Sequence, residues 1–154
     1  MEDWRRIDID ALEADNFLTK EELVPSIDSN LSLQDISNII NECRNYLTKG
    51  KFLESLQLGL DNPPYLFDQS VKDQYNELMF EVLCSIKNNN NDVSPIIKNL
   101  STKQQDVLIK YLYKIMNTSY GSKQGGLMLV WFEKTIEITG LGPIIRFMSD
   151  RRTV

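Results

Sequence analysis

The fold class follows from the stretch STKQQDVLIKYLYKIM, residues 101–116. Ser101 and Gln104 have the spacing of a capping box, in which each side chain binds a free backbone N–H group at the start of a helix. The apolar residues that follow recur at steps of three and four, as on one face of a helix: Val107, Leu108, Tyr111, Leu112 and Ile115. The stretch therefore predicts an amphipathic helix that buries one side.

Helices of the same kind are predicted on the N-terminal side of this stretch. Ser32 can cap a helix that ends at Gly50, because glycine readily adopts the left-handed backbone of a helix end. A shorter helix, 52–60, is followed by Asn62-Pro63-Pro64, and proline cannot continue a helix. Ser70 and Asp73 have cap spacing and should open a long helix that reaches the asparagine run 88–91.

On the C-terminal side, Ser94-Pro95 is expected to cap and start a short helix that runs to Leu100. Residues 120–126 contain three glycines and are predicted to be a flexible connector. A further helix spans 127–138 and should stop at Gly140, and a last short helix covers about 143–148.

No strand is expected after residue 30. The prediction is an all-α protein, an α-α superhelix of about six or seven helices in residues 31–154 with an extended N-terminal arm, residues 1–30. The segment 49–56 resembles part of a tetratricopeptide-type helical hairpin. The predicted caps at Ser32, Ser70 and Ser101 are unevenly spaced, which favours a continuous superhelix over a repeat array.

The charge of the chain is concentrated in the arm. Residues 1–30 carry nine acidic and three basic side chains, whereas the other 124 residues are nearly neutral, within a total net charge of −5. Too few apolar residues are present for the arm to fold alone. The chain also lacks the basic face that displaces counterions from phosphates, so a nucleic-acid partner is not expected.

Few of the chemical groups used in catalysis are present. The chain contains no histidine, which removes the commonest general base and metal ligand. The glycine segment 121–126 lacks the Lys-Ser/Thr pair of a phosphate loop, and the glutamate pairs 77/81 and 133/137 have the spacing of solvated helix faces. Cys43 and Cys84 are expected to be free thiols on apolar faces. We therefore expect no catalytic residue, metal, cofactor or small-molecule substrate.

Membrane and secretory signals are also missing. No stretch approaches the roughly 18 uncharged apolar residues of a membrane span. The first residues are charged and have no apolar core of the kind that a signal peptide carries. The expectation is a cytosolic protein without a membrane partner.

What remains for function is surface that can bind other proteins. Aromatic residues and arginines are enriched where protein interfaces hold most of their binding energy. The candidates in the arm are apolar residues and two arginines: Trp4, Arg5, Arg6, Ile7, Ile9, Phe17 and Leu18. An alternative is that the arm folds back onto its own domain.

A second group of candidate contact residues lies near the other end of the chain. It comprises Ile145, Arg146, Phe147, Asp150, Arg151 and Arg152. The apolar cluster 144–148 can belong to the core, to an interface, or to both, and the sequence does not divide it.

Both ends of the chain resemble a known family. The segments 3–10, 16–18 and 23–25 are similar to the N-terminus of fungal members of the smallest subunit, subunit 5, of the actin-related protein 2/3 complex. The ending GLGPIIRFMSDRRTV, residues 140–154, resembles the ending of that family. Pieces between them occur in the expected order: 62–64, 71–73, 110–114 and 131–134. Phe132 and Pro143 depart from residues that are frequent in the family.

The resemblance implies an α-α superhelical, non-catalytic subunit that docks on subunit 4 and on the β-propeller subunit 1. It also implies that the arm reaches the actin-related protein 2 subunit, and that the complex nucleates branched actin filaments in cortical patches of the cytoplasm. An alternative from the hairpin-like segment is a freestanding tetratricopeptide-like adaptor that binds short peptides.

Overall fold

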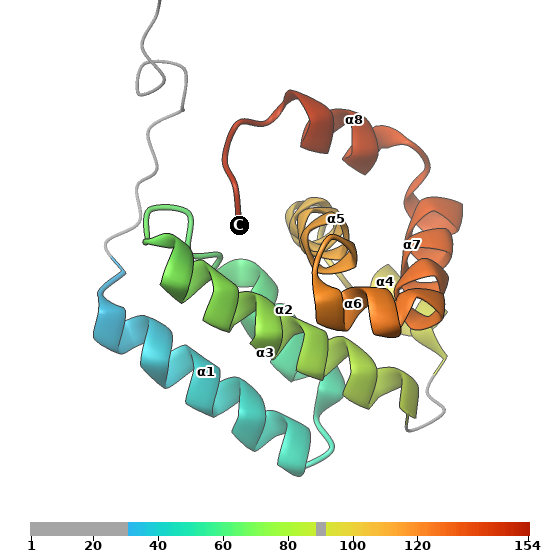
Figure 1. Ribbon diagram of the computed structural model, residues 1–154. Helices are drawn as coiled ribbons and strands as arrows, with labels where there is room; N and C mark the ends of the chain where they lie inside the picture. The colour runs from blue at the N-terminus through green and yellow to red at the C-terminus, as the bar shows by residue number, and fades with distance from the viewer. Residues whose placement is uncertain (1–30, 89–91) are drawn as a thin grey trace, which may run out of the picture.

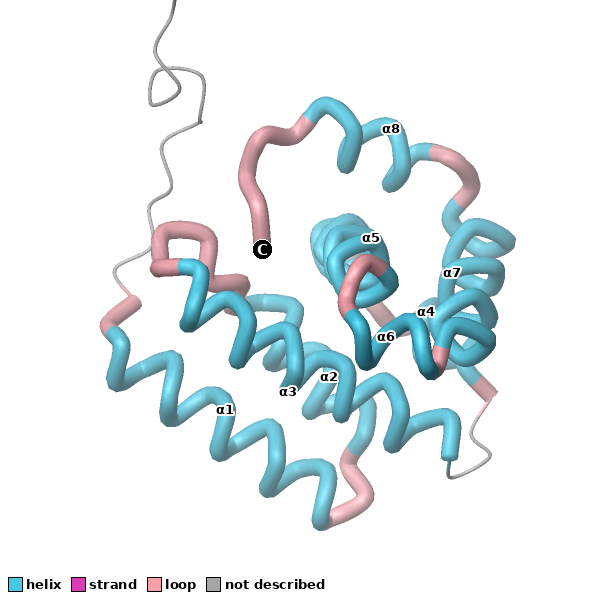
Figure 2. The backbone as a smooth tube through the Cα atoms, in the orientation of Figure 1, coloured by secondary structure: helices cyan, strands magenta, loops and turns pink. Residues whose placement is uncertain are grey.

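The computed structural model describes residues 31–88 and 92–154, and all regular elements in these residues are α-helices (Figure 1). Figure 2 shows the same part of the chain without a strand. The prediction of an all-α superhelix is confirmed, although the described residues form eight helices instead of six or seven. They are α1 (Leu33–Thr48), α2 (Phe52–Asp61), α3 (Gln69–Asn88), α4 (Val93–Lys98), α5 (Thr102–Met116), α6 (Ser119–Lys123), α7 (Gly125–Thr139) and α8 (Gly142–Ser149).

Helix α5 lies at the centre of the superhelix. It packs against α2 and α3 on one side and against α6, α7 and α8 on the other. In Figure 1, α5 is seen nearly end-on, with the layer of α1, α2 and α3 below it and α8 above it. Because five helices pack against α5, its apolar face determines how the two halves of the chain meet. Its capping box is formed as predicted, with bonds of 2.9 and 3.3 Å between Ser101 and Gln104.

The N-terminal half is built on a hairpin of α1 and α2. Gly50 turns the chain between them with a φ of 73°, as its position predicted. The two helices are joined at Cys43 and Ser55: the Ser55 hydroxyl donates to the Cys43 carbonyl at 3.0 Å, and the Cys43 thiol donates to the Ser55 carbonyl at 3.5 Å. Both side chains are completely buried. The hairpin is therefore fixed by polar contacts inside an apolar interface.

Large aromatic side chains connect the hairpin to the other helices. Tyr75 on α3 is fully buried and donates its hydroxyl hydrogen bond to the Gly59 carbonyl on α2 at 2.9 Å. Trp131 on α7 is also fully buried, and its indole N–H donates to the Leu83 carbonyl on α3 at 3.3 Å. Such partners stabilise buried Tyr and Trp side chains by satisfying their polar ends. These contacts make one core across the described helices.

Two predicted helix starts are wrong. Helix α3 begins at Gln69, so Ser70 is inside the first turn, and the Asp73 carboxylate accepts a hydrogen bond from the Gln69 side chain at 2.6 Å. Helix α4 begins at Val93, where the Asp92 side chain accepts from the Ser94 backbone N–H at 3.0 Å. In the second case an acidic cap earlier in the sequence displaces the predicted serine cap.

The predicted flexible connector at 120–126 is also wrong, because it is occupied by α6 and the start of α7. Thr118 caps α6 by accepting a hydrogen bond from the Gly121 backbone N–H at 3.1 Å. Gly121 is buried directly against the carbonyl group of Ile115, where no side chain fits. This glycine serves close packing between α5 and α6 instead of flexibility.

Replacing Gly121 with alanine should destabilise the protein strongly. The added Cβ would lie 2.7 Å from the Ile115 carbonyl carbon, which belongs to the backbone and cannot rotate away. We expect the free energy of unfolding to fall by about 3 kcal/mol, at the upper end for overpacking. Urea denaturation followed by circular dichroism measures this loss.

Gly126→Ala is the matched control, because a Cβ at that position in α7 has nothing within 4 Å. It should leave the protein unchanged or stabilise it by up to about 1 kcal/mol, through the higher helix propensity of alanine. Equal effects of the two substitutions would contradict this account of Gly121.

Candidate functional site

The predicted contact residues near the end of the chain belong to α8 and to the tail that follows it. We call residues 142–154 the C-terminal strap, because they cross α5 and return towards α3 (Figure 1). The other predicted contact residues lie outside the described residues: Trp4, Arg5, Arg6, Ile7, Ile9, Phe17 and Leu18. The site is therefore built on the strap.

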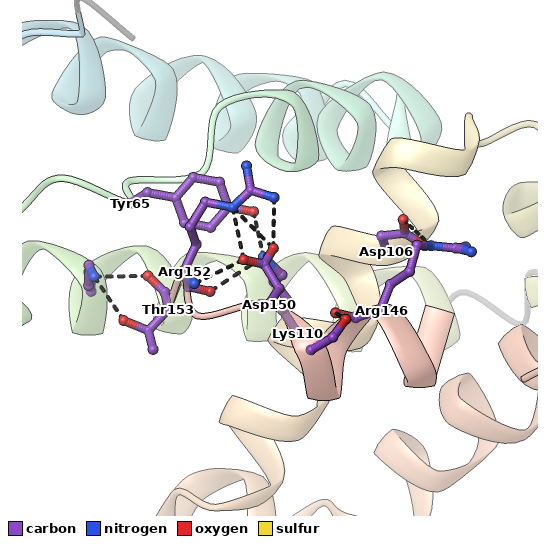
Figure 3. Close-up of polar contacts among 9 residues, drawn as sticks. Tyr65, Asp106, Lys110, Arg146, Asp150, Arg152 and Thr153 are labelled. Atoms are coloured by element: carbon purple, nitrogen blue, oxygen red, sulfur yellow. Dashed lines mark hydrogen bonds and ion pairs between the residues drawn. The ribbon is translucent and has the colours of Figure 1, made fainter. Parts of the chain in front are cut away.

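A buried lysine on α5 holds the strap. Lys110 is only 5% exposed, and its ammonium group lies 2.6 Å from the Asp150 carboxylate. The same group donates to the Tyr65 hydroxyl at 3.1 Å and to the Arg152 carbonyl at 3.4 Å. Figure 3 shows these groups together below the Tyr65 ring. Burial of an ammonium ion is costly unless such partners are provided. Lys110 is thus a fixed anchor for the tail.

Asp150 is shared between this lysine and an arginine. The Arg152 guanidinium donates to the two carboxylate oxygens at 3.0 and 2.8 Å, and the Arg152 backbone N–H donates to one of them at 3.0 Å. Burial by itself would raise the pKa of Asp150, but the hydrogen bonds from Arg152 and Lys110 outweigh burial and hold this pKa well below its ordinary value. The carboxylate is therefore charged, and the Arg152 guanidinium lies over the Tyr65 ring, 5.5 Å from its centre.

The tail continues from this cluster to α3. Lys72 donates from its ammonium group to the Thr153 carbonyl at 2.8 Å and to the Thr153 hydroxyl at 3.2 Å. Val154 is 3% exposed and belongs to the core. The strap therefore closes the superhelix by joining α8, through the tail, to helices from both halves of the chain.

Helix α8 itself rests on α5 through one charged and one aromatic contact. The Arg146 guanidinium makes two hydrogen bonds to the Asp106 carboxylate, at 2.7 and 2.8 Å. The rings of Phe147 and Tyr113 are stacked, with centres 4.5 Å apart and an angle of 5° between their planes. Pro143 at the start of α8 is buried. These contacts fix the rotation of α8 about its axis.

With its inner side fixed, α8 presents an apolar row to the outside. Leu141, Ile145 and Met148 are 64%, 64% and 79% exposed. Their spacing of four and three residues places them along one face of a helix. A row of exposed large apolar side chains on a rigid helix is typical of a surface that binds another protein. We call this row the α8 face.

The structure thus divides the C-terminal contact residues into two groups. Ile145, Arg146 and Arg151 are exposed. Arg146, Phe147, Asp150 and Arg152 make the internal contacts described above, so Arg146 belongs to both groups. Whether these four also contact a partner stays a prediction.

Sequence reasoning missed several residues of the site: Leu141, Lys110, Lys72 and Tyr65. Lys110 stands in the apolar stretch quoted at the outset, and a lysine so placed indicates a buried charge that needs a partner. Nothing in the sequence indicates that Asp150, 40 residues away, is that partner.

The other potentially reactive groups considered in the described residues are the two cysteines and the two glutamate pairs. Burial raises the pKa of the Cys43 thiol to about 11, and both cysteines are free, as predicted. The glutamate pairs 77/81 and 133/137 are exposed, as expected for solvated helix faces. Residues 31–88 and 92–154 contain no group of three or more acidic or cysteine side chains that could hold a metal ion. No helix in these ranges has both the length and the apolar character needed to cross a bilayer.

The fold and the strap define an all-α superhelical protein whose most distinctive surface is an exposed apolar helix face. A family model described as the ARP2/3 complex 16 kDa subunit (p16-Arc) matches residues 3–154. The chain therefore belongs to the p16-Arc family, and the resemblance noted in its sequence is confirmed.

Relatives of this family are similar over nearly the whole chain. Actin-related protein 2/3 complex subunit 5 of Saccharomyces cerevisiae is 42% identical over 153 residues, which cover 99% of this chain and 98% of the relative. Subunit 5-C of Xenopus laevis is 30% identical over 98% of this chain and 94% of its own length. The human subunit 5-like protein is 26% identical over 98% and 94%.

Removing the charge of Asp150 should destabilise the protein, because it leaves the Lys110 ammonium buried without an anion. For Asp150→Asn we expect a loss of about 3 kcal/mol in the free energy of unfolding. The double variant Lys110→Met with Asp150→Asn should recover most of this loss, since no charge is then stranded. Glu137→Gln breaks the exposed pair with Lys134 and should cost less than about 0.5 kcal/mol. Chemical denaturation of the wild type and the three variants tests this function of the ion pair. A double variant that is no more stable than Asp150→Asn would contradict it.

The stabilisation from Asp150 should depend on pH in one direction. Its pKa in the folded protein lies below the ordinary value of 3.8, so folding favours the charged form. The contribution is complete above about pH 5 and is lost as the pH falls towards the folded pKa. The difference in unfolding free energy between the wild type and Asp150→Asn should stay constant from about pH 5 to 8 and narrow below about pH 4. A gap that persists unchanged at about pH 3 would show that the charge of Asp150 does not stabilise the fold.

Proposed function

We propose that this chain is a non-catalytic structural subunit of the actin-related protein 2/3 complex and supports the nucleation of branched actin filaments. In this proposal it docks on subunit 4 and on the β-propeller subunit 1, and its arm tethers the actin-related protein 2 subunit. It works in the cytoplasm, in cortical actin patches, and meets filaments only through the complex. The observation that carries the proposal is the family match over residues 3–154, with relatives named as subunits of that complex.

The α8 face supports a docking function. Its three apolar side chains are all more than half exposed, which is unfavourable in an isolated protein and favourable once a partner covers them. The strap holds them on a helix whose orientation is fixed by Arg146 and Phe147. A surface that is already ordered loses little conformational entropy when it binds.

The chemistry of the chain supports a non-catalytic function. There is no histidine in the sequence, and burial raises the pKa of the Cys84 thiol as it does that of Cys43, so both thiols stay protonated at neutral pH. The most strongly perturbed carboxylate in the described residues, Asp150, is already engaged by Lys110 and Arg152. What the chain offers a partner is contact surface.

The arm supports the tethering function through its composition. Residues 1–30 carry a large excess of acidic side chains, among which Trp4, Ile7 and Ile9 supply apolar anchors. A segment of this composition can exchange chain entropy for contacts when it binds, with charge guiding the encounter. The arm and the helical body, residues 31–154, then have separate tasks.

Deleting residues 1–25 tests this division of tasks. We expect the truncated chain to assemble with the other subunits, because the α8 face and the strap are intact. Retention of the actin-related protein 2 subunit should fall several-fold on washing, since the anchors are lost. Affinity purification of the tagged chain at native expression levels, followed by quantitative mass spectrometry and a pyrene-actin nucleation assay, measures both effects.

The full-length tagged chain is the control and should recover the other subunits in equal amounts. Full retention and full nucleation after the deletion would refute the tethering function of the arm. A full-length chain recovered alone would refute the proposed function as a whole.

A further inference from the structure

Beside the α8 face lies a groove between α5 and the strap. It has a volume of about 740 Å³. Its apolar lining comes from Tyr113, Met116, Phe147 and Met148, together with the buried Val154. Met148 belongs both to this groove and to the α8 face. The groove is large enough for two or three apolar side chains, and we call it the α5–α8 groove.

The rim of this groove is positively charged. Its lining residues include three basic side chains, Lys110, Lys114 and Arg152, and one acidic side chain, Asp150. Asp150 is already occupied by the other two bases, whereas Lys114 forms no ion pair with any described residue.

A fourth cation lies close by. The Lys72 ammonium binds Thr153 of the groove, and its pKa is lowered by burial and by the charge of Lys114. The ammonium groups of Lys72 and Lys114 thus repel each other beside an apolar surface. An anion from outside would relieve this repulsion.

We propose that the α5–α8 groove binds an acidic segment of a neighbouring subunit, which inserts one or two large apolar side chains between Tyr113, Met116 and Met148. A carboxylate of the same segment pairs with Lys114. The inference rests on the proposed function, because it assigns one docking contact of the assembled subunit. The positive charge of the groove favours a partner segment of negative charge. The apolar lining favours large apolar side chains in that segment.

A protein segment fits this groove better than a polyanion. The groove surface is mostly apolar, and its excess of positive charge is confined to a few side chains. Nucleic acids and anionic membranes bind extended basic faces that make many phosphate contacts. An acidic segment with an apolar anchor uses both features of the groove.

Cross-linking in the assembled complex tests the occupant directly. The photoreactive residue p-benzoylphenylalanine is placed at Met148, which is 79% exposed, and the complex is irradiated after purification. We expect a single dominant cross-link to another subunit, in a segment where acidic residues outnumber basic ones and at least one large apolar residue is present. The same probe at Leu33, an exposed position on α1, is the control for random contacts.

Several outcomes would overturn the inference: a yield at Met148 no higher than at Leu33, a cross-link to a neutral or basic segment, to residues 1–30 of this chain, or to a second copy. If the complex still purifies intact in such a case, the proposed function stands and only the groove assignment fails. A chain that does not purify with the complex would refute both the proposed function and the groove assignment.

Charge reversal gives an independent measurement. Lys114→Glu should weaken rebinding of the chain to a complex that lacks this subunit by about fivefold at low salt, with the difference shrinking at high salt. Lys49→Glu makes the same change at an exposed lysine in the α1–α2 turn and should rebind normally. Thermal unfolding of both variants checks that the fold is kept. Equal affinities of the two variants, with the fold intact, would overturn the carboxylate contact.

Discussion

The strap depends on one buried ion pair, between Lys110 of α5 and Asp150 of the tail. Once the ammonium group is inside the protein, the carboxylate must stay beside it, because an unpaired charge there costs several kcal/mol, on the order of the stability of a whole small domain. Arg152 and Tyr65 complete the arrangement by satisfying the remaining hydrogen-bonding groups. The position of α8 follows from this pair, since the tail leaves α8 directly at Asp150. The outward direction of Ile145 and Met148 is then set by contacts on the opposite side of the same helix.

Local features of the fold could be predicted from the sequence because their determinants lie within a few residues. The capping box at Ser101 and Gln104 formed as its spacing indicates, and Gly140 ends α7 with a φ of 70°. Predictions failed where a second local signal competed. Thr118 made a helix out of residues that look like a glycine-rich connector, and Asp92 replaced Ser94 as a cap. In each case a neighbouring side chain with better geometry took the backbone N–H groups.

The candidate site was predictable only in part. The sequence showed that residues 145–152 are rich in contact-forming side chains, but not which of them face inward. That division depends on Asp106 and Tyr113, which lie about one quarter of the chain earlier and meet α8 only in the folded protein. The same holds for Lys110, whose partner is equally distant. Long-range pairing of this kind leaves no periodic pattern in a single sequence, whereas membership of the p16-Arc family was readable from both ends of the chain.

The way in which α8 is attached gives the α8 face a local stability that can differ from that of the central core. Its principal packing partner is α5, and the tail beyond it is tied by a small number of charged contacts to α3 and α5. Such a peripheral unit can open and reclose while the central core stays folded, as native-state hydrogen exchange reveals for cooperative subunits in other proteins. A neighbour that covers α8 would bind only the closed form and would therefore lower the population of the open form. Assembly and local order of the strap are thereby thermodynamically linked, even though they involve opposite sides of one helix.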